Sequence, residues 1–165
     1  MEYWARRILL SQFNRTSKSI EEIERQLIKY YGKAQKKIID QFIETYEKVL
    51  AAVEEGRTPT PADLYKLDTY WQGQTQLRDI LKELGNVEAE ILSNAFASQY
   101  LDAYNSIALP GAETFSTMDL TIAHEIINQV WCDDGKSWSE RIWDNTAELA
   151  QTLESELTQC LITGK

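Results

Sequence analysis

Apolar residues recur at every third or fourth position from residue 20 to residue 53. Their mean spacing of about 3.7 residues fits a straight α-helix. Ser19 and Glu22 form a capping-box pattern at its start, so the sequence predicts one helix over residues 19–55. That helix spans on the order of 50 Å, so part of it projects or pairs lengthwise with another long helix. The row consists of Ile20, Ile23, Leu27, Tyr31, Ala34, Ile38, Phe42, Tyr46, Val49 and Val53.

Breaks in the apolar pattern delimit further helices. Thr60, Asn86 and Thr117 are residue types that cap helix N-termini, while Gly56 and Gly85 can end the helices before them. Pro61, after Thr60, suits the first position of a helix. The predicted helices are residues 2–13, 19–55, 61–84, 87–107 and 118–130, with interruptions at residues 14–17 and a loop at residues 109–111.

Composition agrees with a helical chain. Only 7 Gly and 3 Pro occur in 165 residues, and 43% of the residues are hydrophobic, which is enough to form a core. We therefore predict an all-α fold, an elongated multi-helix bundle with long antiparallel helices and no sheet. We expect a single helical domain over residues 1–165, with an N-terminal helical arm (1–57) and a helical body (60–165).

Charge is distributed unevenly along the chain. Residues 1–57 carry 11 Lys and Arg against 9 Asp and Glu, whereas residues 58–165 carry 6 against 17. Because phosphate contacts need cationic side chains, any affinity for DNA belongs to the first third. Basic residues there recur about every four positions on one helix face. This stripe is either a solvated face or a contact for DNA or an acidic partner. It consists of Arg25, Lys29, Lys33, Lys36 and Lys37.

The sequence contains no pattern typical of catalysis, metal binding or membrane insertion. His124 is the single histidine, and Cys132 and Cys160 have no partner at metal-ligand spacing. No phosphate-binding or nucleophile motif occurs. No apolar run of about 18 residues exists, and no signal-peptide pattern opens the chain. We expect no catalytic residue, no metal, no cofactor and no membrane partner, and hence no enzyme.

The C-terminal stretch is the most distinctive part of the sequence. Asp133, Asp134 and Gly135 are turn-forming residues, and Ser137 with Glu140 forms a second capping box. An apolar stripe follows at spacings of 7, 4, 4 and 4, which predicts a long capped helix. The stripe consists of Ile142, Leu149, Leu153, Leu157 and Leu161.

Aromatic residues concentrate around this turn and along the middle helices. Trp131, Trp138 and Trp143 account for three of the five tryptophans, a density that fits a core corner or a docking surface. A second set can likewise form a groove or pack in the core. That set consists of Tyr65, Tyr70, Trp71, Tyr100 and Tyr104.

These C-terminal residues also resemble a known family. The run Trp131-x-x-Asp134-Gly135-Lys136-x-Trp138-Ser139-x-Arg141-Ile142-Trp143-x-Asn145, with Leu149, Leu153, Leu157, Gln159 and Ile162-x-Gly164, is similar to the minor head (head morphogenesis) proteins of tailed bacteriophages and prophages. A second similar stretch runs from Ala62-Asp63-Leu64-Tyr65 to Leu84-Gly85, and Tyr3-Trp4 with Arg7 echo the family at the start.

The resemblance implies a structural virion component that acts at or near the portal in capsid assembly and in DNA packaging or delivery. It implies portal and capsid proteins, and phage DNA, as partners. It places the protein in the capsid interior, and in the host bacterial cytoplasm before assembly. Family members continue beyond the position of Gly164 into a C-terminal domain, so we expect an N-terminal portion of a longer protein or a truncated gene. The alternatives are a DNA-binding accessory module that uses the basic stripe, and an enzyme fragment.

The tryptophan junction is where we expect a partner to bind. The predicted turn fixes the directions of the side chains that follow it, so Trp138, Arg141 and Trp143 are the candidate docking residues. We expect Trp131 and Trp138 to pack in the core, and Trp143 with Arg141 to lie nearer the surface.

Overall fold

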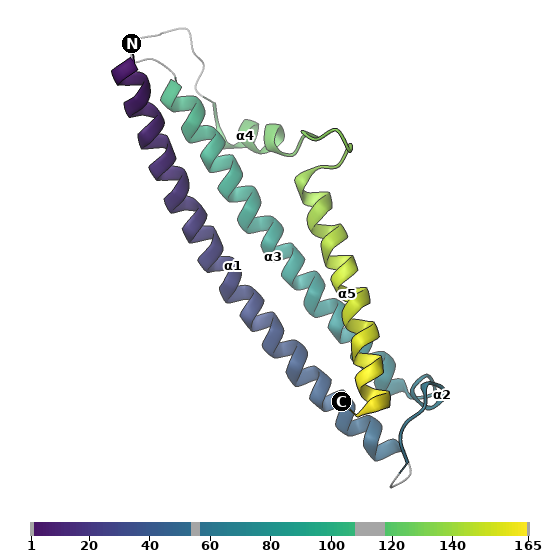
Figure 1. Cartoon of the computed structure of the whole chain (residues 1–165). Coiled ribbons are helices and arrows are strands. Elements are labelled where there is room, and N and C mark those ends of the chain that lie inside the picture. Colours follow the sequence, from purple (N-terminus) through teal and green to yellow (C-terminus); the bar gives the residue numbers. More distant parts are fainter. Residues whose placement is uncertain (1, 54–56, 108–117, 165) are drawn as a thin grey trace. The chain divides into compact units, whose positions relative to one another are not determined.

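The computed structural model describes residues 2–53, 57–107 and 118–164. They form five α-helices and no strand, which confirms the all-α prediction (Figure 1). The predicted helix end at Gly56, the loop at residues 109–111 and the Thr117 cap lie outside the described residues. The helices are α1 (Glu2–Ala52), α2 (Pro61–Leu64), α3 (Asp68–Ile107), α4 (Leu120–Ile127) and α5 (Trp138–Thr163).

Helix α1 runs without a break from Glu2 to Ala52. The predicted interruption at residues 14–17 and the helix start at Ser19 are therefore wrong. Intrinsic propensity is a weak preference that flanking helix and tertiary contacts override. Ser19 has a different partner, because Gln99 of α3 donates a hydrogen bond from Nε2 to the Ser19 Oγ at 2.9 Å.

The predicted N-cap at Thr60 is confirmed, and Asp63 completes a capping box with it. The Thr60 amide donates to Asp63 Oδ2 at 3.0 Å, the Asp63 amide donates to Thr60 Oγ1 at 3.4 Å, and Pro61 occupies the first turn. The helix that starts here ends at Leu64, however, and α3 begins only at Asp68. The predicted helix over residues 61–84 is therefore two helices.

Helix α3 continues through the residues predicted to end it. Gly85 is buried inside the helix and Asn86 follows it without a break, so the predicted end at Gly85 and the cap at Asn86 are wrong. Helix α4 is shorter than the predicted helix over residues 118–130. It starts after Asp119, whose Oδ1 accepts the Ile122 amide at 2.9 Å.

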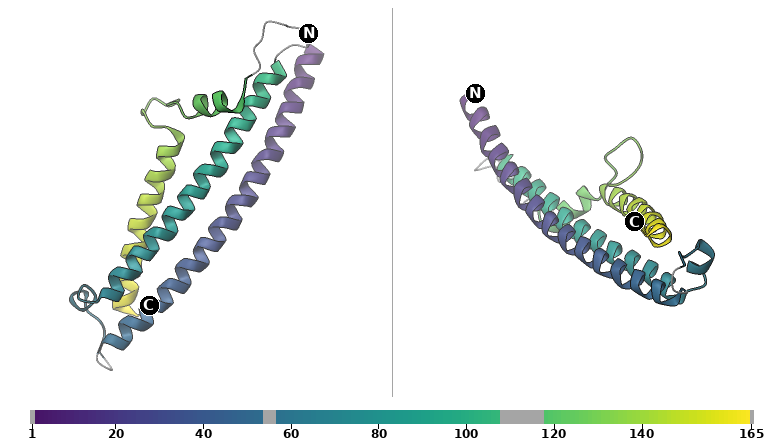
Figure 2. Two further views of the ribbon diagram at one scale, coloured as in Figure 1. Left: turned by 180° about the vertical axis from the view of Figure 1, so that it is seen from behind. Right: turned by 60° about the horizontal axis from the view of Figure 1, so that its bottom comes forward.

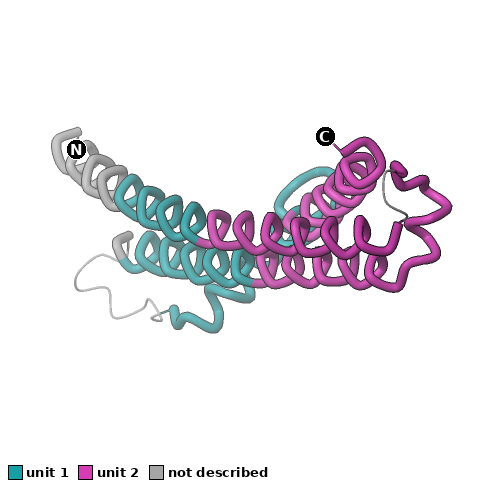
Figure 3. Tube along the Cα trace, turned by 90° about the horizontal axis from the view of Figure 1, so that it is seen from below, with its two compact units in different colours: residues 1–29, 87–141 teal, residues 30–86, 142–165 magenta. Residues whose placement is uncertain are grey.

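The chain divides into two compact units, and each draws on distant parts of the sequence (Figure 3). Unit 1 comprises Met1–Lys29 and Val87–Arg141, and unit 2 comprises Tyr30–Asn86 and Ile142–Lys165. These boundaries differ from the expected arm and body, because both units combine residues from before 57 with residues from after 60. Within each unit, its stretch of α1 lies beside its stretch of α3 (Figures 1 and 2).

In unit 2 the α1 and α3 stretches run antiparallel. Lys37 Nζ lies 2.8 Å from Glu83 Oε2, and Thr45 meets Gly73, so partner numbers fall along α3 as they rise along α1. The C-terminal half of α5 completes the core with Leu161 and Ile162. Each fully buried aliphatic side chain contributes about 1.5–3 kcal/mol. The core cluster consists of Val49, Leu64, Tyr70 and Leu161, with Phe42, Tyr46, Leu67 and Ile162 packed against it.

Unit 1 has a separate, smaller core. Ala97 of α3 and Ala123 and Ile127 of α4 are buried together. The small alanine side chains let α4 lie close against α3. Tyr100, Leu101 and Met118 pack against this cluster.

Candidate functional site

The turn before α5 in unit 1 is built by the residues predicted to form it. The Gly135 amide donates to the Cys132 carbonyl at 3.2 Å, and Gly135 has a φ of +73°, a conformation open to glycine at little cost. Asp134 Oδ1 accepts the Lys136 amide at 3.2 Å and its Oδ2 accepts Arg141 Nη2 at 2.6 Å. Asp134 therefore ties the turn to the first turn of α5.

The predicted capping box at Ser137 is confirmed. The Ser137 amide donates to Glu140 Oε2 at 2.7 Å, and the Glu140 amide donates to Ser137 Oγ at 3.3 Å. The Ser137 hydroxyl also donates to Glu140 Oε2 at 2.8 Å. These bonds satisfy backbone donors that a helix N-terminus leaves unpaired. They fix where α5 begins, and so where Trp138 and Arg141 point.

Only one of the two tryptophans predicted to pack does so. Trp138 is half-buried and meets the ring of Phe96 edge to face, with centroids 5.5 Å apart. The Trp138 Nε1 is buried and has no hydrogen-bond partner among the described residues. Trp131 is 65% exposed, so its predicted burial is wrong. Its Nε1 donates to the Ile126 carbonyl at 3.1 Å, which holds the ring beside the end of α4 rather than in the core.

Trp143 belongs to unit 2, whereas Trp138 and Arg141 belong to unit 1. As predicted, Trp143 and Arg141 lie at the surface, with Trp143 39% exposed. The Trp143 ring also packs on Gly85. A Cβ on Gly85 would lie 2.9 Å from Trp143 Cζ3, so the glycine that was predicted to end a helix receives this ring.

The turn leaves further apolar side chains of unit 1 at the surface. Val130 is exposed beside Trp131, and Leu120 and Ile122 are exposed on α4. This exposure could not be predicted from the sequence, because an apolar residue next to a turn is compatible with burial or exposure. Trp131 is therefore the most exposed of the three junction tryptophans, although the sequence prediction did not include it among the candidate docking residues.

Three members of the basic stripe have partners within the chain. Arg25 Nη1 lies 3.6 Å from Glu22 Oε2, and Lys37 Nζ lies 2.8 Å from Glu83 Oε2. Lys33 Nζ lies 5.4 Å from the centroid of the Tyr30 ring, a cation–π distance. Lys29 and Lys36 are exposed. The stripe therefore lies at the surface, where ion pairs contribute about 0–1 kcal/mol to stability.

The second aromatic set is divided between the two units. Tyr100 and Tyr104 belong to unit 1, whereas the rings of Tyr65 and Trp71 stack in unit 2 with centroids 5.9 Å apart. Tyr70 is buried and meets both of these rings edge to face. Of the two alternatives, a groove or core packing, core packing holds for Tyr70, whereas Tyr65 and Trp71 are exposed.

A hollow of about 350 Å³ in unit 2 lies between α3 and α5 beside these rings. Arg78 lines it and forms a two-bonded ion pair with Glu154, with Nη2 and Oε2 2.8 Å apart. This hydrogen bonding raises the pKa of Arg78. Arg78 and Glu154 therefore neutralise each other. The rest of the hollow is lined by aromatic rings, amides and hydroxyl groups.

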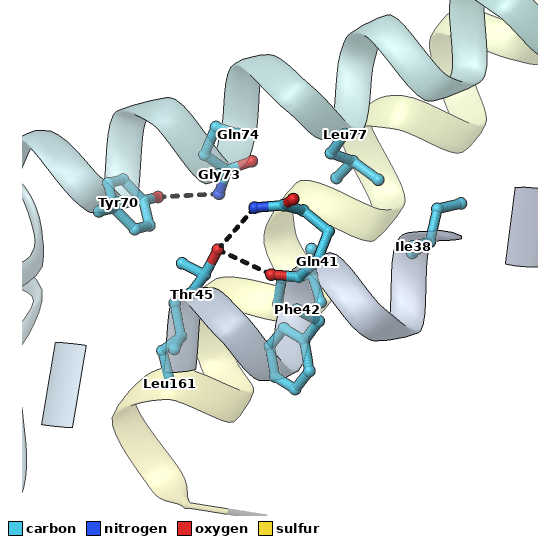
Figure 4. A pocket seen from close by; sticks show the side chains of 10 residues that line it. Ile38, Gln41, Phe42, Thr45, Tyr70, Gly73, Gln74, Leu77 and Leu161 are labelled. Atoms are coloured by element: carbon cyan, nitrogen blue, oxygen red, sulfur yellow. Dashed lines mark hydrogen bonds between the residues drawn. The ribbon is translucent and has the colours of Figure 1, made fainter. Parts of the chain in front are cut away.

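A smaller cavity of about 20 Å³ lies in unit 2 between α1, α3 and α5 (Figure 4). Gln41 Nε2 donates to Thr45 Oγ1 at 3.3 Å, and Gln74 Nε2 donates to the Tyr70 hydroxyl at 3.2 Å. The Gln74 Oε1 is buried with no partner among the described residues. A cavity needs about 10–15 Å³ to hold one water, so this one has room for a water and for no larger ligand.

No protein-family model matches the chain, and no curated protein or solved structure matches it either. The resemblance to phage minor head proteins therefore stays a hypothesis that rests on the residues given for it.

Within the described ranges, no group of three or more His, Cys, Asp and Glu side chains could hold a metal ion. His124 Nδ1 lies 3.1 Å from Ser93 Oγ, which joins α4 to α3. The described thiols of Cys132 and Cys160 are free. Of the described helices, none combines the length and apolar character needed to cross a membrane.

Proposed function

We propose that this chain is a structural component of a tailed-phage head that acts at or near the portal during capsid assembly and DNA packaging or delivery. The observation that carries the proposal is the resemblance of residues 131–164 to the minor head proteins. The geometry of the junction supports it. Asp134, Gly135, Ser137, Glu140 and Arg141 form one connected turn and cap, so an idiosyncratic run of residues makes one defined local structure.

In this proposal the protein works through its surface rather than through an active site. Trp131 of unit 1 is 65% exposed on a turn that hydrogen bonds hold in place. A large ring presented by a fixed turn contributes contact area at little loss of conformational entropy. Arg141 is exposed beside the turn, and Trp143 is exposed on unit 2. These side chains are the proposed contacts with the portal or with capsid proteins.

Co-purification with the portal tests this proposal. The tagged chain is expressed together with the portal protein encoded by the gene immediately upstream of its own, and the bound portal is quantified after affinity capture. We expect the two proteins to co-purify, and we expect added DNA to leave the amount of captured portal protein unchanged. Trp131→Ala, and the double variant Arg141→Ala with Trp143→Ala, should each reduce capture at least tenfold.

A matched control separates docking from folding. Trp71→Ala with Lys66→Ala also removes one exposed tryptophan and one exposed cation, but from unit 2 near α2. This control should bind the portal like the original chain. If no portal co-purifies, or if the control loses as much binding as the junction variants, the proposal is wrong. Thermal melts show whether each variant, including Trp143→Ala with its expected partial loss of stability, is still folded at the temperature of the capture.

A DNA-binding accessory role is the second candidate. It is supported by exposed lysines on α1, of which Lys29, Lys33 and Lys36 point to the surface. Phosphate-driven binding weakens steeply as salt rises, so a titration of duplex DNA at several salt concentrations tests it. Changing these three lysines to Glu should abolish such binding and leave the melting temperature unchanged. Salt-independent binding, or none, would exclude this role.

A further inference from the structure

One side of α1 in unit 2 carries apolar residues that the core does not use. Ile39 and Ile43 are each 49% exposed, and Leu50 is 43% exposed. Gly32 on the same helix is also exposed. We name these four residues the outer apolar face. Exposed apolar residues that share one helix face indicate an interaction surface.

The spacing of the outer apolar face is the same in both directions along the helix. The steps from Gly32 to Ile39, Ile43 and Leu50 are 7, 4 and 7 residues. At 3.6 residues per turn the four positions lie within about 40° of one another around the helix. An antiparallel copy of this helix, centred on residue 41, therefore sets Ile39 against Ile43 and Gly32 against Leu50 of the other copy.

Gly32 fits this arrangement because it has no side chain and so leaves space on the helix surface. A Cβ added at Gly32 meets nothing within 4 Å, so no contact among the described residues requires a glycine there. A glycine inside a helix is unfavourable relative to alanine, and it lets another chain approach the backbone closely. In the antiparallel register the Leu50 side chain of a second copy occupies the space above Gly32.

The charges along this part of α1 also select the antiparallel direction. Lys33, Lys36 and Lys37 lie before Ile38, and Asp40, Glu44 and Glu47 lie after it together with one cation, Lys48, which pairs with Glu44. Lys36 and Glu47 are exposed and lie on the same flank of the outer apolar face. Antiparallel pairing brings the basic segment of each copy to the acidic segment of the other, with Lys36 beside Glu47. Parallel pairing would place like charges together.

We propose that two copies of this chain associate through the outer apolar face of α1, as an antiparallel helix pair about a two-fold axis near residue 41. A two-fold interface uses the same patch on both subunits, which the spacing and the charges of this helix both satisfy. The proposal goes beyond the head-protein function and does not depend on it. It also gives Lys36 a partner other than DNA.

Analytical ultracentrifugation of the chain over a range of concentrations tests this association. We expect a reversible monomer–dimer equilibrium. Ile43→Glu should raise the dissociation constant at least tenfold, because each interface then buries two carboxylates without partners. Leu149→Glu is the matched control, since Leu149 is an exposed leucine of α5 in the same unit. It should leave the dissociation constant unchanged.

Charge exchange tests the register at exposed positions where folding is not at risk. Lys36→Glu alone and Glu47→Lys alone should each weaken the dimer several-fold at low salt, and the double variant should restore the original dissociation constant. A chain that stays monomeric at millimolar concentration overturns the proposal. A dimer that Ile43→Glu leaves intact, or that the double exchange does not restore, overturns it as well.

Discussion

The backbone of α3 at Gly73 lies directly against the Thr45 side chain of α1 in unit 2. A Cβ on Gly73 would stand 2.6 Å from Thr45 Oγ1 and 2.9 Å from Thr45 Cγ2. Thr45 is buried, and its hydroxyl donates to the Gln41 carbonyl at 2.9 Å, which holds the side chain in place (Figure 4). This glycine sets how closely the two helices approach at that point.

Gly73→Ala should therefore destabilise the protein although alanine is the better helix former. Overpacking a core costs about 1–3 kcal/mol, and the propensity gain returns about 1 kcal/mol, so we expect a net loss of up to about 2 kcal/mol. Chemical denaturation measures it. Thr45→Ala should restore much of the loss when combined with Gly73→Ala. Simple additivity of the two changes would show that Gly73 and Thr45 are not in contact.

Trp143 and Gly85 form the equivalent contact between α5 and α3 in unit 2. Trp143→Ala should lower the free energy of unfolding by about 2 kcal/mol, which is less than for a fully buried tryptophan because the ring is partly exposed. Gly85→Ala should also destabilise, since its Cβ would meet Trp143 Cζ3 at 2.9 Å. An unchanged melting temperature for Trp143→Ala would mean that this ring serves only a partner.

Ser137→Ala should cost about 1 kcal/mol, the usual loss for a helix N-cap. Both hydrogen bonds of the capping box depend on Ser137 and Glu140, and the turn that presents Trp131 leads into them. Ser155→Ala, at an exposed position inside α5, is the matched control. Thermal denaturation compares the two variants. Equal effects would show that the Ser137 hydroxyl does not act as the cap.

Asp63 should make stability depend on pH in the acid range. Hydrogen bonds from the Arg57 guanidinium, and then from Thr60, hold the pKa of the Asp63 carboxyl well below its ordinary value. Because the unfolded chain binds the proton more readily, this contribution is fully present above about pH 4 and is lost as the pH falls toward the folded pKa.

The measurement compares melting temperatures of the original chain and Asp63→Asn between neutral and acid pH. We expect the variant to melt lower near pH 6, and the difference to shrink below about pH 4. Asp79→Asn, at an exposed position of α3, controls for the removal of one charge. A difference that grows as the pH falls would contradict the assigned hydrogen bonds.

Elements whose contacts lie between near neighbours in the chain could be predicted from the sequence. Apolar spacing of three to four residues identified the long helices. The Thr60 cap and the Ser137 capping box formed as predicted, because their atoms lie within three residues of each other. The capping-box pattern at Ser19 and Glu22 lies inside α1 instead. The turn at Gly135 belongs to the same class, since it depends on the positive φ of one glycine and on hydrogen bonds between near neighbours.

Features whose contacts come from residues far apart in the chain could not be predicted and follow from tertiary packing. Gly85 has the signature of a helix end, yet it lies inside α3 because the Trp143 ring packs on its backbone from α5. Trp131 is a large apolar residue of the kind that cores contain. It is nevertheless exposed, because its Nε1 donates a hydrogen bond to the Ile126 carbonyl at the end of α4. A glycine or a tryptophan takes its role from what packs against it, and residues far apart in the chain provide those contacts.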